Sequence, residues 1–125
     1  METRATNTGE NFVFSRDMLT ARSIEAKTGI VACKPYMVKR VWATGRKQWP
    51  DVRWFPCGMP LSLEDYLTEE ITWDKTIPLM VGDLQRLLVY EKMGYQVHVD
   101  VPNEIWQAYE RLSAAGYDRY VIREF

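Results

Sequence analysis

Basic and aromatic side chains alternate between Lys34 and Pro56, in the stretch KPYMVKRVWATGRKQWPDVRWFP. Six of its residues are Lys or Arg, five are Tyr, Trp or Phe, and Asp51 is its single acid. Cationic side chains attract phosphates and carboxylates, while aromatic rings stack on bases or anchor protein interfaces. The stretch therefore predicts a surface that binds an anionic macromolecule. The residues expected to make contact are Lys39, Arg40, Trp42, Arg46, Lys47, Trp49, Arg53 and Trp54.

The same composition also suits a packed core. Tryptophans in short elements commonly pack inward, and the aliphatic stems of Lys and Arg cover the edge of such a core. If the rings are exposed, two partners fit them. Unpaired bases would stack on the tryptophans while the arginines follow the phosphates, or Trp and Arg would anchor a protein interface. A dedicated nucleic-acid binder usually has a basic excess, so the net charge of −1 favours the protein partner.

Charge is distributed unevenly along the chain. Residues 16–56 carry nine Lys or Arg against three acids, and residues 57–125 carry six against twelve. In a compact fold the two halves can face one another and neutralise, or they can form a bipolar surface that steers a charged partner. The acidic run from Leu63 to Asp74 raises a further hypothesis, imitation of a nucleic-acid backbone, but five acids on a short helix favour a solvated helix surface instead.

Catalytic chemistry has little support in the residue types. One histidine, His98, excludes a histidine metal cluster, and the isolated glycines do not form a phosphate-binding loop. The one nucleophilic arrangement that the composition permits is a Cys57–His98 dyad, which needs the two side chains within hydrogen-bond reach. We expect a protein that is not an enzyme and that needs no metal or cofactor, and we keep a small thiol enzyme using Cys57 as an alternative.

The length of 125 residues suits one domain, with residues 1–10 as a flexible arm and residues 11–125 as a single folded unit. A domain of this size does not need a disulfide to fold. Cys33 and Cys57 are expected to be buried free thiols, and a single disulfide between them is the alternative. Without a signal-peptide core or a membrane-length apolar run, the sequence predicts a cytoplasmic protein with no membrane contact.

In the first half, the patterns predict short strands and a hairpin. Residues 11–15 are expected to form a strand, and residues 16–27 a helix capped by Ser15 and closed near Gly29. The hairpin strands are predicted at residues 36–43 and 51–55, with a basic tip at residues 44–50.

In the second half, helices alternate with strands. Ser62 is expected to cap a helix over residues 63–70, and Thr76 a helix over residues 76–94. Asn103 is expected to cap a third helix, which ends at Gly116. Strict alternation over residues 95–101 predicts a strand with Tyr95 inward and Gln96 outward, and residues 117–125 predict a last strand with Tyr120 and Ile122 on one face. The predicted fold is α+β: an N-terminal β-hairpin region and a C-terminal α-β-α-β portion packed on one mixed sheet.

These observations favour a small non-enzymatic interaction protein that binds, and in doing so can inhibit, a macromolecular partner through the basic aromatic hairpin. A protein partner is expected, single-stranded nucleic acid is the alternative, and the chain is expected to be a monomer or homodimer. Small size and the lack of motifs fit an accessory protein of a phage or mobile element.

Overall fold

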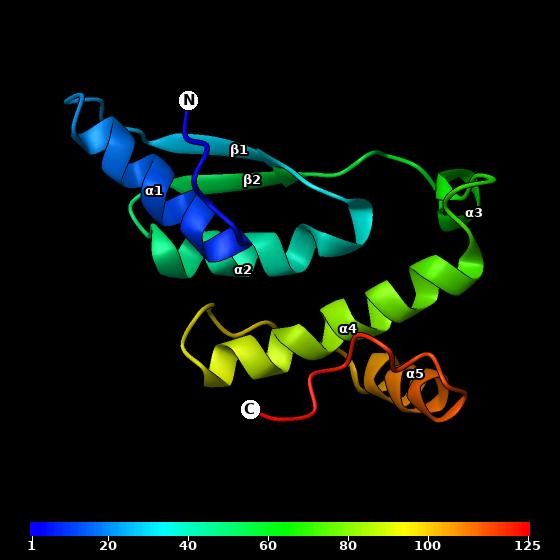
Figure 1. The fold of residues 1–125 in the computed structure, drawn as a ribbon. Helices are drawn as coiled ribbons and strands as arrows, with labels where there is room; N and C mark the ends of the chain where they lie inside the picture. The colour runs from blue at the N-terminus through cyan, green and yellow to red at the C-terminus, as the bar shows by residue number, and fades with distance from the viewer.

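The computed structural model describes residues 1–125 and contains five α-helices and a two-stranded sheet (Figure 1). The α+β class predicted from the sequence is confirmed. The elements are α1 (Thr8–Thr20), β1 (Thr28–Ala32), the 3-10 turn η1 (Pro35–Met37), α2 (Val38–Gln48), β2 (Arg53–Cys57), α3 (Leu63–Tyr66), α4 (Trp73–Lys92) and α5 (Asn103–Ala114). No helix has the length and apolar character needed to cross a membrane.

The sheet is parallel, and the predicted hairpin is wrong. β1 and β2 pair from Thr28 opposite Arg53 to Ala32 opposite Cys57, and the chain between them runs back through α2 (Figure 1). Parallel strands need such a crossover, whereas a hairpin joins antiparallel strands. The predicted strand and tip over residues 36–50 are therefore mostly helix. Pro35 opens η1 at its first position, where a missing N–H is not needed, and α2 follows directly.

Trp54 lies where α1, α2 and the sheet meet. Its ring is 4.7 Å from the ring of Phe12 and 5.4 Å from that of Trp49, both edge to face. Its indole N–H donates to the Trp49 carbonyl at 3.0 Å. Gly45 of α2 makes this approach possible, because a Cβ there would lie 2.8 Å from Phe12 and 3.0 Å from Trp54. The aromatic contacts thus fix how α1 and α2 lie against the sheet.

The N-terminal region forms one helix instead of the predicted strand and later helix. α1 begins at Thr8 because the Asn7 side chain accepts a hydrogen bond from the Glu10 backbone N–H at 2.9 Å. The first turn of α1 thus falls within the segment predicted as a flexible arm. Gly29, predicted to end a helix, lies inside β1.

Helix ends in the second half follow the sequence signals more closely. Ser62 caps α3 as predicted by accepting from the Asp65 N–H at 3.1 Å, although α3 ends already at Tyr66. Gly94 and Gly116 have φ values of +75° and +93° directly after α4 and α5, where the left-handed conformation favours glycine. α4 begins at Trp73, one turn earlier than the predicted cap at Thr76, and Thr76 is itself buried.

Neither predicted C-terminal strand forms, so the mixed sheet is also wrong. Residues 95–101 and 117–125 are irregular segments that pair with helices instead of strands. The expected orientation of the first is reversed only at its start, since Gln96 is buried and Tyr95 is 49% exposed, whereas over residues 97–101 the valines are half-buried and His98 and Asp100 are exposed as expected. The reason is a polar contact: the Gln96 amide donates to the Leu87 carbonyl at 2.9 Å. The Gln85 side chain likewise exchanges two hydrogen bonds with the backbone of Ile122, each 2.8 Å long.

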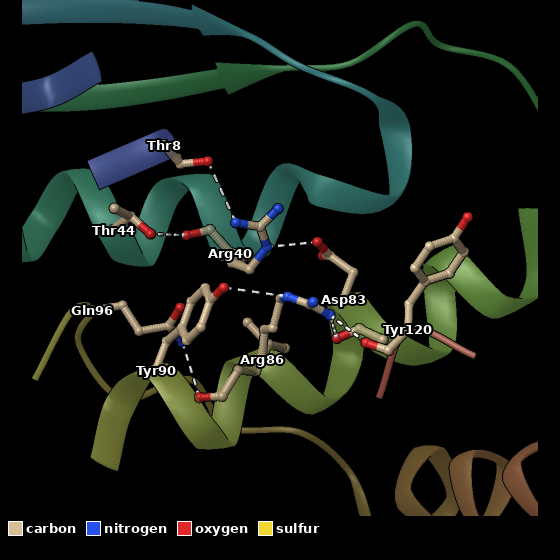
Figure 2. Close-up of polar contacts among 10 residues, drawn as sticks. Thr8, Arg40, Thr44, Asp83, Arg86, Tyr90, Gln96 and Tyr120 are labelled. Carbon is tan, nitrogen blue, oxygen red and sulfur yellow. Dashed lines mark hydrogen bonds and ion pairs between the residues drawn. The ribbon is translucent and has the colours of Figure 1, made fainter. Parts of the chain in front are cut away.

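A buried ion pair joins the two halves of the chain. The Arg40 guanidinium on α2 donates to Asp83 Oδ1 on α4 at 2.5 Å, and each side chain is only 10% exposed (Figure 2). Arg40 also reaches Thr8 Oγ1 on α1 at 3.4 Å. Figure 2 shows Arg86, one turn further along α4, directed toward the Tyr120 carbonyl, to which it donates at 2.9 Å. Two arginines thus connect α4 with segments far away in sequence.

We expect Arg40→Met to lower the free energy of unfolding by about 3–5 kcal/mol, because it leaves the buried Asp83 carboxylate without its partner. The double variant Arg40→Met/Asp83→Leu should lose less, since it removes both charges. Urea denaturation followed by circular dichroism measures each value. Arg46→Met, a matched change at an exposed position of the same helix, should stay within about 0.5 kcal/mol of the parent. A double variant less stable than Arg40→Met would contradict the ion-pair interpretation.

Candidate functional site

The structure divides the eight predicted contact residues into two sets. Two of them belong to the core and are corrections: Arg40 is 9% exposed in its ion pair, and Trp49 is 8% exposed beside Trp54. The predicted tip at Arg46–Trp49 therefore ends in a buried ring. The others reach the surface, with Trp54 only half-buried: Lys39, Trp42, Arg46, Lys47, Arg53 and Trp54.

A groove brings most of the surface set together. It has a volume of about 460 Å³ and lies between α2 and β2; we call it the Trp42 groove, and its lining residues are Trp42, Arg46, Arg53, Trp54, Phe55 and Val97. Trp42 and Arg46 are four residues apart on α2, so they share one face of the helix. Arg53 and Phe55 alternate on β2, and the Arg53 guanidinium lies 5.0 Å from the Phe55 ring centroid.

Helix periodicity explains why part of the basic stretch faces solvent. Lys39, Trp42 and Arg46 recur at a spacing of three and four residues on α2, whereas Val41 and Gly45 between them are buried. The prediction of a strand over the same residues placed neighbours on opposite faces and could not find this division. Trp42 is 38% exposed, although tryptophan side chains are on average highly buried.

The positive charges at the groove are not neutralised inside the molecule. Arg46 and Arg53, the two cations that line the groove, take part in none of the ion pairs of the structure. Lys39 and Lys47, which lie on α2 outside the groove lining, are also without an ion pair. Arg40–Asp83 is the one ion pair between the basic first half and the acidic second half. Mutual neutralisation of the two halves is thus confined to that buried pair, and the groove keeps a local excess of positive charge.

Sequence reasoning missed two lining residues, Phe55 and Val97. Phe55 is 46% exposed. Its exposure could have been predicted from the strand pattern, because alternation in Arg53-Trp54-Phe55 places Arg53 and Phe55 on one face and Trp54 on the other. Val97 had no such signal. It reaches the groove because its backbone N–H donates to the Ala43 carbonyl on α2 at 3.1 Å.

The structure does not bring Cys57 and His98 into a dyad. Nδ1 of His98 is 2.9 Å from Glu91 and Nε2 is 3.0 Å from Asp100, so both ring nitrogens face carboxylates. The Cys57 thiol is exposed at the end of β2 and donates weakly to the Gly58 carbonyl at 3.8 Å. No group of three or more His, Cys, Asp or Glu side chains gathers where it could hold a metal ion.

The cysteines are free thiols on adjacent strand ends, and neither is fully buried. The Cys33 backbone N–H donates to the Cys57 carbonyl at 2.9 Å. Partial burial, with a smaller effect of the neighbouring Cys57, raises the pKa of Cys33. A raised pKa keeps this thiol protonated and slow to react.

We expect the pKa of His98 to lie above its ordinary value of about 6.5, because its hydrogen bonds with Glu91 and Asp100 favour the imidazolium. This contribution to stability is fully present below the unfolded pKa and is lost as pH rises through the folded pKa. An NMR titration of the ring protons measures the value. Glu91→Gln should lower it, whereas Asp118→Asn, which removes a carboxylate paired elsewhere, should not. A pKa at or below 6.5 in the parent would contradict the assignment.

Comparisons with known proteins leave the function open. No protein-family model matches the chain, and no solved structure matches it. Over 124 residues the chain is 34% identical to an uncharacterized protein of Streptomyces coelicolor. The alignment covers 99% of this chain and 56% of that protein, so the chain spans about half the length of the curated relative it matches.

Proposed function

We propose that this chain is a non-enzymatic interaction protein that binds an acidic face of a protein partner through the Trp42 groove. One observation carries the proposal: Arg46 and Arg53, two cations without an intramolecular ion pair, line an open groove that contains the exposed rings of Trp42 and Phe55. Trp and Arg are enriched among the residues that contribute most to protein interfaces.

The chemistry of the groove supports a carboxylate-bearing partner. The free guanidinium groups of Arg46 and Arg53 can each bind a carboxylate in a bidentate fashion. Trp42 and Phe55 supply apolar area that loses water when the partner docks. The cations at the rim would speed association by electrostatic attraction, whereas the rings would slow dissociation. Cytoplasmic location, inhibition of the partner and origin in a phage or mobile element stay predictions.

Affinity capture tests the groove. The parent chain is used as bait in a lysate of its native host, with and without nuclease, and is compared with Trp42→Ala/Arg46→Glu. We expect a defined partner that survives nuclease and is lost with this variant, because the variant removes one ring and reverses one charge. The control Arg22→Glu/Arg119→Glu reverses two exposed charges outside the groove and should retain the partner. Circular dichroism verifies the fold of each variant, and capture by a folded groove variant as strong as by the parent would reject the proposal.

Single-stranded nucleic acid is a second candidate, favoured by the exposed rings of Trp42 and Phe55 next to Arg46 and Arg53. Bases stack on such rings while the arginines contact phosphates. Fluorescence anisotropy with a labelled mixed-sequence oligonucleotide would then show binding that weakens steeply with salt, and Arg46→Glu/Arg53→Glu would abolish it. Binding that does not change between 50 and 200 mM salt, or no binding at all, would reject this candidate.

A further inference from the structure

A cavity with a volume of about 730 Å³ lies between the start of α2 and the helices α4 and α5. Asp83 of the buried ion pair is part of its wall. Apolar side chains form most of its wall, among them Val38, Trp73, Leu84, Ala108 and Leu112. We call it the α4–α5 cavity. Cavities of about 300–1,000 Å³ with mostly apolar walls and few polar groups are typical of sites for small organic molecules.

Open apolar surface of this extent is unfavourable in water. Trp73 and Ile105, which line the cavity, are 45% and 42% exposed, although residues of these types gain free energy from burial. α4 and α5 are long and regular, so the cavity is formed by rigid elements instead of loops. A molecule that fills it would remove apolar area from water without reorganising the fold.

One polar group in the wall has an acceptor that the protein does not use. Asp83 is 8% exposed and its Oδ1 accepts from Arg40, whereas Oδ2 accepts no hydrogen bond from the protein and is not sealed from solvent. Water or a bound molecule can therefore donate to Oδ2, and a hydrogen bond to a charged acceptor is stronger than one between neutral groups. Burial raises the pKa of Asp83, and Arg40 and Arg86 offset part of this effect.

The charges around the cavity select against ions. Arg40 and Asp83 together are neutral, so they offer little net attraction to either sign. The other titratable groups in the wall are the cation Lys39 and the phenols of Tyr36 and Tyr109. Asp83 repels an anion that approaches its free oxygen, and Lys39 repels a cation. A neutral molecule avoids both effects and still can donate a hydrogen bond.

We propose that the α4–α5 cavity binds a neutral, mostly apolar small molecule, such as a phenol or alcohol, that donates one hydrogen bond to Asp83 Oδ2. The apolar body of the molecule lies against Leu84, Ala108 and Leu112, and its single donor faces the carboxylate. This site is separate from the Trp42 groove, and its existence does not depend on the proposed function.

Three probes of equal ring size test the ligand class by isothermal titration calorimetry on the full chain. 2-Naphthol carries a neutral donor, 2-methoxynaphthalene has no donor, and 2-naphthoate is an anion. We expect 2-naphthol to bind about tenfold more tightly than 2-methoxynaphthalene, the scale of one hydrogen bond to a charged acceptor, and 2-naphthoate to bind most weakly. Equal affinities of the first two, tighter binding of the anion, or no binding of 2-naphthol would overturn the proposal.

A matched pair of variants tests the location. Ala108→Trp fills the cavity from α5 and should weaken 2-naphthol binding at least tenfold, whereas Ala114→Trp places the same ring on an exposed position of that helix and should leave it unchanged. If Ala108→Trp does not fold, NOEs in the parent between 2-naphthol and the methyl groups of Leu84 and Leu112 locate the site. NOEs only to residues outside the cavity, or unchanged binding by folded Ala108→Trp, would reject it.

Discussion

The buried contact between Arg40 and Asp83 is the interaction on which the rest of the structure depends. Arg40 comes from the β1–α2–β2 unit, Asp83 from the middle of α4, and Thr8 of α1 contacts the same guanidinium. Buried charges are tolerated only when each has its partner, because burying an unpaired charge costs several kcal/mol of desolvation free energy. The pair therefore joins α2 to α4 through a defined face of each helix.

This orientation decides what the basic stretch presents to solvent. With Arg40 turned inward toward α4 and Val41 toward the sheet, the helix has one remaining face, on which Lys39, Trp42 and Arg46 recur. β2 then adds Arg53 and Phe55 beside that face. The Trp42 groove is thus a consequence of the same packing that uses one of the basic residues for structure. Its charge stays available because the acidic second half supplies one partner only, to the buried arginine.

The same pair also separates two environments. Toward the α4–α5 cavity, Asp83 offers an oxygen that the protein does not satisfy, and the wall around it is nearly all apolar. Arg40, in turn, contributes to a separate and more polar cavity with Thr8 and Gln48. A single ion pair can in this way stabilise the junction of three helices and leave a specific acceptor in an otherwise hydrophobic site.

Local signals in the sequence determined those parts of the fold that depend on neighbouring residues. Ser62 marks the start of α3, and Gly94 and Gly116 mark the ends of α4 and α5, because capping and left-handed backbone conformations involve only a few consecutive residues. The α+β class, the helical pattern of the second half and the basic aromatic composition of the candidate site were accessible in the same way. Five of the eight predicted contact residues are exposed, and Trp54 is half-buried.

Only the tertiary structure decided which partner each segment has. Residues 38–48 carry β-branched and aromatic side chains that suit a strand, but the parallel pairing of β1 with β2 requires a crossover, and the helix is the element that covers their inner face. Alternation over residues 95–101 predicted the inner side correctly from Val97 onward but not at Tyr95 and Gln96, because the Leu87 carbonyl holds Gln96 inside. Arg40 and Trp49 resemble their exposed neighbours in sequence, yet they are buried because Asp83 and Trp54 lie next to them in space. The sequence by itself thus determined the chemistry of the candidate surface, and long-range contacts decided which residues compose it.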